Sequence, residues 1–293
     1  MATNKELISN RTRLLYLTMF YISSTTLISV LVLFAFDQPL YNTIQDLSSG
    51  LLNINLLTSA ILIISTIYML LIKIGPFRWV DLGASEPQVR IPLAIISFFV
   101  MWGAMQVTIV FYLISAGQEI EFADYWLNDG LLFSLGLIIG HLFGNALFEE
   151  LGFRAFFFPQ MDYAFKQLTN QKTALLSALI LSQILFALVH LPIRIYNDDS
   201  LDVIPFVFLT IYGIGLCFVY IRTRNIFLAI TTHALLNFNI PLFDSKGFDY
   251  TGSFLLALIA ILVFYPRFES KVYTLIKNES YALRDNEEQW ENV

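Results

Sequence analysis

Residues 131–158 read LLFSLGLIIGHLFGNALFEELGFRAFFF, an apolar run that Glu149, Glu150 and Arg154 interrupt. About 20 apolar residues in a helix cross the roughly 30 Å hydrocarbon core of a bilayer. An ionisable side chain at the centre of such a helix costs about 3 kcal/mol on insertion scales, so it indicates a functional site by default. This run therefore predicts a membrane helix, and its charged residues predict where the functional site lies on that helix.

The rest of the chain has the same apolar character. Its 293 residues are 57% hydrophobic and 14% charged, far less charge than a soluble domain of this size carries. We predict an all-α polytopic membrane protein. The first apolar run is too long for a signal peptide and is expected to remain attached. The eight predicted transmembrane helices are 14–36, 51–73, 92–116, 131–148 (extending to 158 in a longer version), 173–193, 203–221, 226–243 and 250–266.

Loop charges predict the orientation of these helices. With eight spans, 15 of the 17 Lys and Arg residues fall on the side of both termini, and only Arg194 and Lys246 fall on the other side. The positive-inside rule then makes both termini cytoplasmic. We expect three N-terminal helices in 1–130, a core in 131–243, and a last helix with a cytoplasmic tail in 244–293. A basic nucleic-acid face is absent, and the single Cys217 excludes a disulfide framework.

The acidic pair sits next to a matching base. Glu150 and Arg154 are one helical turn apart with the acid first, the favourable order for an ion pair. Glu149 is rotated from Glu150 by about 100° on an α-helix, so it is predicted to face different surroundings and to be available for chemistry.

All three histidines of the chain also lie in apolar segments. His190 follows Phe186 by one turn, and His233 precedes Asn237 by one turn, so each pair shares a helix face. His141 lies on one stripe with Asn145 and Glu149 and is expected to be structural. Inside a membrane every such group needs a hydrogen-bond partner, which is either another helix or a reacting substrate.

Three motifs carry a family resemblance. Glu149-Glu150-Leu-Gly-Phe-Arg154, Phe186-Ala-Leu-Val-His190 and His233-Ala-Leu-Leu-Asn237 resemble those of the CAAX protease and bacteriocin-processing family, also called CPBP or Abi. Its members are intramembrane endopeptidases related to the type II CAAX prenyl proteases. The resemblance covers 131–243 and departs from the family at Ala155, where many members have Gly.

The resemblance implies hydrolysis of a peptide bond without a covalent intermediate. Glu149 would be the general base that deprotonates water. Glu150 and Arg154 would form the supporting ion pair. The remaining roles it implies are water positioning and proton transfer by His190, and oxyanion stabilisation by His233 and Asn237.

A metal-dependent version uses the same residues. Glu149, His190 and His233 would form a two-imidazole, one-carboxylate zinc site with water as the fourth ligand. The metal-free version, with no cofactor, is preferred because His233 and Asn237 suit an oxyanion clamp. In addition, no His-Glu-x-x-His pair places two ligands on one helix.

Two other classes of function remain open. An ion-coupled transporter also places Glu, His and Arg inside the membrane, but it would be expected to show inverted repeats. A non-catalytic scaffold, such as a bacteriocin-immunity factor, would retain the fold without needing Glu149. For the enzyme we expect membrane lipid and a peptide or small membrane-protein substrate, lipidated ones included, in a bacterial cytoplasmic membrane.

The depths of the motif residues conflict in a simple up-and-down arrangement. His190 falls roughly 10 Å further out than Glu149, at a rise of 1.5 Å per residue. We therefore expect the fifth span to start further into the cytoplasm, to tilt, or to break near Pro192.

Overall fold

A computed structural model describes residues 39–52, 85–127, 130–196 and 202–290 continuously, with ten isolated positions between 19 and 64. Within these segments the one strand-like pairing is an isolated bridge between Phe122 and Phe243. The all-α fold class is therefore confirmed. The helices are α2 (Pro39–Leu47), α4 (Pro87–Ser115), α5 (Asp124–Leu127), α6 (Leu131–Ile139), η2 (Gly140–Ala146), α7 (Leu147–Glu149), η3 (Glu150–Phe157), α8 (Phe158–Lys166), α9 (Gln171–Leu188), α10 (Leu191–Tyr196), α11 (Val203–Thr223), α12 (Ile226–Asn237) and α13 (Thr251–Trp290).

Five helices of the described chain are long and apolar enough to cross a membrane. They correspond to five of the predicted spans. The predicted spans 14–36 and 51–73 lie outside the continuously described residues. The five helices are Pro87–Ser115, Leu131–Lys166, Gln171–Leu188, Val203–Thr223 and Thr251–Val272.

The predicted span 226–243 is helical only over Ile226–Asn237. Twelve residues rise about 18 Å, which is too short to cross the hydrocarbon core. The helix ends at Asn237, and Asn239 and Pro241 follow within four residues. It ends early because Asn side chains and Pro both favour non-helical backbone. α12 is therefore a short internal helix.

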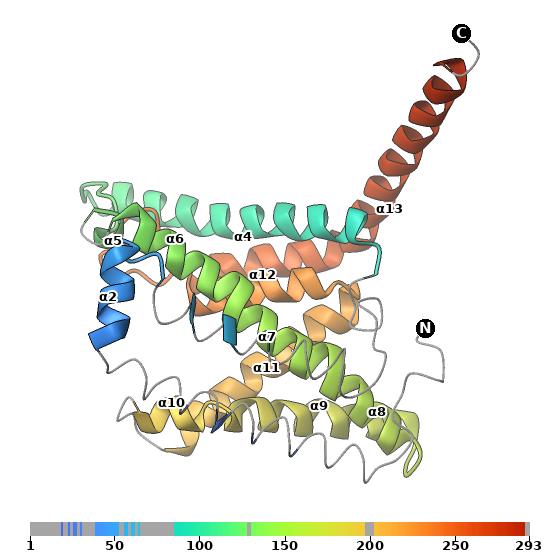
Figure 1. Ribbon diagram of the computed structural model, residues 1–293, viewed down its shortest axis with the longest axis horizontal. Helices are drawn as coiled ribbons and strands as arrows, with labels where there is room; N and C mark the ends of the chain where they lie inside the picture. Colours follow the sequence, from blue (N-terminus) through green and yellow to red (C-terminus); the bar gives the residue numbers. More distant parts are fainter. Residues whose placement is uncertain are drawn as a thin grey trace.

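The segments α6, η2, α7, η3 and α8 form one continuous helix of 36 residues that runs diagonally between α4 and α9 (Figure 1). We call it the motif rod, Leu131–Lys166. Two of its segments, η2 and η3, are π-helical and flank Glu149 on both sides. π-helical turns are frequent at functional sites because they shift the direction of neighbouring side chains. Glu149 lies at the middle of the rod.

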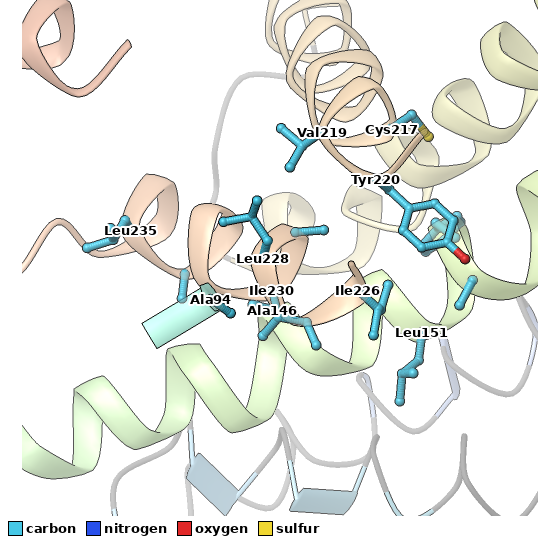
Figure 2. Close-up of a cluster of buried hydrophobic side chains, with 14 of the residues drawn as sticks. Ala94, Ala146, Leu151, Cys217, Val219, Tyr220, Ile226, Leu228, Ile230 and Leu235 are labelled. Carbon is cyan, nitrogen blue, oxygen red and sulfur yellow. The ribbon is translucent and has the colours of Figure 1, made fainter. Parts of the chain in front are cut away.

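α12 packs against α4, α11 and the η2 segment of the motif rod, and nearly all of its residues from Ile226 to Leu235 are buried. The glycines at four-residue spacing on the rod, Gly136, Gly140 and Gly144, are buried as well. Because lipid is as apolar as these side chains, close packing rather than the hydrophobic effect holds them together. The cluster in Figure 2 joins Ala94, Ala146, Leu151, Cys217, Val219, Tyr220, Ile226, Leu228, Ile230 and Leu235 from four parts of the chain.

The outward faces of the long helices are apolar, as expected of surfaces that meet lipid. Phe111 of α4 is 70% exposed and Leu256 of α13 is 71% exposed. Polar residues such as Ser182, Gln183 and Asn225 are instead fully buried. This distribution is that of a multi-pass membrane protein, which agrees with the predicted location of the chain in a membrane.

Asn225 fixes the start of α12. Its side-chain oxygen accepts hydrogen bonds from the N–H groups of Phe227 and Leu228, at 3.0 and 3.2 Å. Its amide nitrogen donates to the carbonyl of Arg90 at 2.9 Å and to the hydroxyl of Tyr265 at 2.8 Å. One side chain thus caps α12 and ties it to α4 and α13.

Candidate active site

The predicted ion pair of the first motif is present and completely buried. Arg154 Nη1 lies 3.0 Å from Glu150 Oε1, and neither side chain is exposed. Arg154 Nη2 also donates to the carbonyl of Gly213 at 3.4 Å, and the guanidinium carbon lies 4.3 Å from the centre of the Phe186 ring. Contacts from α9 and α11 therefore hold the arginine in place.

His233 joins the first motif to the third. Its Nδ1 donates to Glu150 Oε1 at 2.7 Å, and its Nε2 lies 3.4 Å from Glu149 Oε2. The two glutamates have different surroundings, as predicted, because Glu150 is fully buried against Arg154 whereas Glu149 is 13% exposed and lies near His190. Both carboxylates nevertheless face this one imidazole, at a point where the rod changes from α-helix to π-helix.

His190 reaches Glu149 from the end of α9. Its Nδ1 donates to the carbonyl of Phe186 at 2.9 Å, which leaves Nε2 directed toward Glu149, 3.7 Å from Oε1. The roughly 10 Å offset of the simple up-and-down arrangement is absent, and the fifth span breaks near Pro192, one of the expected ways to remove it. The motif rod runs obliquely, and α9 ends at Leu188 so that His190 lies in the turn before α10, which contains Pro192.

The acidic and basic groups of this cluster lie close together in buried or nearly buried positions. Two carboxylates, one guanidinium and two imidazoles share the site. Each ring nitrogen of His233 lies opposite one of the two carboxylates.

The Phe186 ring packs against both histidines. Its centroid lies 5.0 Å from that of His190 and 6.0 Å from that of His233, in edge-on geometry both times. The same ring faces Arg154 and is 2% exposed. Edge-on rings and a cation over a ring face are favourable arrangements, so Phe186 fixes the orientation of three charged or polar partners.

Asn237 lies apart from the cluster. It is the last residue of α12 and its side chain is exposed, and no hydrogen bond among the described contacts joins it to the glutamates or histidines. His141 lies on η2, half-buried, with its ring stacked on Phe238 at 5.4 Å. The structure therefore brings five of the six predicted site residues together and leaves the sixth one helical turn away from His233.

A buried polar layer behind Arg154 was not predicted. Gln183 Nε2 donates to Ser182 Oγ at 2.9 Å and to Cys217 Sγ at 3.0 Å, and none of these three side chains is exposed. Gly213 lets α11 approach this layer closely, since a Cβ there would lie 2.4 Å from Gln183 Oε1. The signal in the sequence was a Ser-Gln pair inside an apolar span.

Glu149, His190 and His233 are the residues whose chemistry suits a metal ion. Each imidazole has its Nδ1 engaged and presents Nε2, as metal-binding histidines do. Within the described segments, no group of three or more His, Cys, Asp or Glu side chains is arranged to hold a metal.

These features define a multi-pass, all-helical membrane protein with a buried cluster of two Glu, two His and one Arg. Residues 129–239 match a family model described as "Type II CAAX prenyl endopeptidase Rce1-like", which confirms the resemblance predicted from the three motifs. The matched segment contains all six predicted site residues. Over this segment the chain is therefore similar to membrane proteases of the CAAX type. No curated protein and no solved structure matches the chain.

Proposed function

We propose that the protein is an intramembrane endopeptidase in which Glu149 activates a water molecule for attack on a peptide bond. One observation carries this proposal. The Glu149 carboxylate lies between Nε2 of His190 and Nε2 of His233, which come from separate segments of the chain. Carboxylate and imidazole groups that lie together in a nearly buried position commonly act as general acids and bases.

The fixed tautomer of His190 defines where the water would bind. Because the carbonyl of Phe186 can only accept, Nδ1 carries the proton and Nε2 of the neutral ring accepts. Glu149 Oε1 and His190 Nε2 are 3.7 Å apart, so one water can lie about 2.8 Å from both. Such a water donates one hydrogen to each and keeps its lone pairs for the substrate carbonyl.

The remaining steps move one proton from the water to the leaving amine and form a transient oxyanion. Attack transfers one proton of the water to Glu149 and places a negative charge on the former carbonyl oxygen. The imidazole of His233 and the amide of Asn237 would stabilise that oxyanion, and loss of such a donor typically costs about 10²–10³ in rate. When the C–N bond breaks, the leaving amine takes a proton from Glu149, directly or through His190.

We propose the metal-free version of this reaction. The support is that His233 has a carboxylate opposite each ring nitrogen, so that both nitrogens already have partners within the protein. In the zinc alternative, Glu149, His190 and His233 would hold the ion, and the ion would supply Lewis-acid activation of water.

The complete topology and the substrate belong to the same proposal. We propose eight spans with both termini in the cytoplasm of a bacterial cell. The positive-inside count favours this arrangement, with residues 226–243 as the seventh span, of which only α12 is helical. The substrate class is a peptide or small membrane protein, lipidated ones included, that reaches the site from the membrane.

The test is cleavage of CAAX-type and leader-type fluorogenic peptides by the purified full chain. Glu149→Ala and His233→Ala are measured beside it, each with and without a strong chelator. Loss of cleavage in both variants with indifference to the chelator is the expected result. Cleavage that a chelator abolishes and zinc restores would show that the same residues act as metal ligands. Cellular function that survives Glu149→Ala would exclude the enzyme and favour a scaffold.

A further inference from the structure

The chain that follows Asn237 is irregular, yet side chains of α4 hold its backbone. We call residues 238–250, between α12 and α13, the strap. Trp102 Nε1 donates to the carbonyl of Ile240 at 2.8 Å, and Gln106 Nε2 donates to the same carbonyl at 3.5 Å. Gln106 Oε1 accepts from the N–H of Leu242 at 2.8 Å. The nitrogen and the oxygen of the Gln106 amide therefore both bond to the strap, the first at Ile240 and the second at Leu242.

The α5 region holds the other side of the strap. Trp126 Nε1 donates to the carbonyl of Pro241 at 3.0 Å. The N–H of Ala123 donates to the carbonyl of Leu242 at 3.1 Å, and the N–H of Asp244 donates to the carbonyl of Glu121 at 3.0 Å. The strap is thus bonded between two elements that lie earlier in the chain than the motif rod.

The backbone conformation of Ile240 shows that neighbouring residues constrain the strap. Its φ is +47°, a left-handed backbone conformation that β-branched residues rarely adopt. Such a conformation persists only where the surroundings over-determine it, and here two donors converge on the Ile240 carbonyl. Strain of this kind is common next to functional sites.

α12 depends on the strap for its C-terminal end. Helix ends fray, and a helix of twelve residues is marginal on its own. Asn225 fixes the start of α12 firmly. Its end has one capping bond, from the Phe238 N–H to the Ala234 carbonyl at 2.9 Å. Asn237 is the last helical residue, so its position follows that of the strap.

Gln106 is an unusual residue for its place. It lies on a membrane-type helix and is only 6% exposed, where a polar side chain without partners is costly. Both of its polar ends are used on the strap and, together with Trp102 one turn earlier, it forms a polar face on α4. The family match begins at residue 129, so both residues lie outside it.

We infer that Trp102 and Gln106 are positioning residues for the proposed peptide hydrolysis. They fix the strap at Ile240 and Leu242, and the fixed strap holds Asn237 where it can donate to the oxyanion. This inference rests on the proposed function, since it assigns Asn237 a role in that reaction.

The kinetic test uses Gln106→Met and Trp102→Phe, which remove the hydrogen bonds and keep most of the side-chain volume. Thr108→Val is the matched control, because the Thr108 hydroxyl bonds only within α4, to the Ala104 carbonyl. In the first two variants we expect kcat to fall about tenfold or more, with KM unchanged. This loss should be smaller than the loss caused by removing the oxyanion donor itself. The control keeps the wild-type kcat.

A double variant tests whether the effect passes through Asn237. In the Asn237→Ala background, Gln106→Met should cause little further loss of kcat, because residues that act through one another are not additive. Full additivity of the two losses would overturn the inference and leave Gln106 a merely structural residue.

Amide hydrogen exchange supplies a readout that does not depend on activity. Gln106→Met should raise the exchange of the 238–243 amides and leave α9 unchanged. Unchanged exchange, or raised exchange with wild-type kcat, would overturn the inference while Glu149-dependent cleavage still stood. If wild-type cleavage survives Glu149→Ala, the proposed function fails, and the positioning role falls with it.

Discussion

Glu150 Oε1 accepts a hydrogen bond from His233 Nδ1 at 2.7 Å, while the same oxygen pairs with Arg154 Nη1 at 3.0 Å. One carboxylate oxygen therefore connects the first motif to the third. The ion pair that neutralises the interior also sets which way the imidazole ring points. Stability and chemistry depend on the same atom, and substitutions can separate them.

Glu150→Gln should be both unstable and inactive. The change leaves the buried Arg154 guanidinium without its counter-charge, and breaking a buried pair by removing one partner costs about 3–5 kcal/mol. Adding Arg154→Met to Glu150→Gln should recover much of the melting temperature, because no buried charge then lacks a partner. It should not recover cleavage, because His233 has lost the carboxylate that orients it.

The control for this pair lies on the same rod. Asp162 and Lys166 are also one turn apart, but the lysine is 41% exposed. Asp162→Asn should destabilise the protein much less than Glu150→Gln, because this pair is partly exposed to solvent. A double variant at 150 and 154 that cleaves peptides at the wild-type rate would refute a role for Glu150 in orienting His233.

Gly213→Ala should destabilise the contact between α9 and α11. The new Cβ would lie 2.4 Å from Gln183 Oε1 and 3.1 Å from the Phe186 ring. Gln183 is fully buried and held by two hydrogen bonds, so the clash costs about 1–3 kcal/mol. Gly215→Ala is the control, since nothing lies within 4 Å of its added Cβ. Equal melting temperatures for the two variants would contradict this account of the close approach.

Asn225→Asp should destabilise the protein, although Asp caps helices as well as Asn does. The carboxylate keeps the acceptor for Phe227 and Leu228 but loses both amide donations, and it faces the Arg90 carbonyl. We expect a loss of about 2 kcal/mol or more, since a buried charge is left opposite an acceptor. Asn170→Asp at the start of α9, where the side chain serves only as a cap, should be neutral. Thermal unfolding of the two variants side by side provides the measurement.

The outer end of the strap should be sensitive to pH at both extremes. The pKa of Asp244 is lowered by the hydrogen bond from the Lys246 N–H and then by the ammonium group, and the pKa of Lys246 is raised by its bonds to Glu121 and Asp244. A lowered carboxyl pKa stabilises the fold above the unfolded value, so this contribution is lost as the pH falls below about 4. A raised lysine pKa stabilises the fold below the unfolded value of about 10.4 and is lost as the pH rises beyond it.

Hydrogen exchange of the Asp244 and Ala123 amides, corrected for intrinsic rates, measures this effect. Protection should be greatest between about pH 5 and pH 10 and should decline on both sides. Lys246→Met should remove the decline at high pH and weaken the decline at low pH, where the N–H of residue 246 still bonds to Asp244. A wild-type profile that is already flat over this range would show that the Glu121–Asp244–Lys246 cluster does not stabilise the strap.

The local features of the site were predictable. Glu149, Glu150 and Arg154 stand out because charges in an apolar run are costly, and the ion pair follows from a spacing of four residues. The same reasoning selected His190 and His233. For the depth of His190 it left a shifted, tilted or broken fifth span open, because span lengths carry no information about the tilt of the motif rod or the break after Leu188.

The supporting contacts were not predictable, because they join residues far apart in the chain. Asn225 meets Arg90 across 135 positions, and Gln106 meets Leu242 across 136. Spacing rules describe one helix at a time and cannot pair residues on different helices. The π-helical turns around Glu149 likewise have no simple sequence signal, and they decide that both glutamates face His233.

The short, enclosed α12 separates the reaction from the surrounding lipid. Its residues from Ile226 to Leu235 pack against protein on nearly every side, so changes in bilayer thickness act on the long outer helices and not on the helix that carries His233. Lipid composition should therefore govern how often a substrate arrives. The rate at which a bound substrate is cut should be the same in thin and thick bilayers.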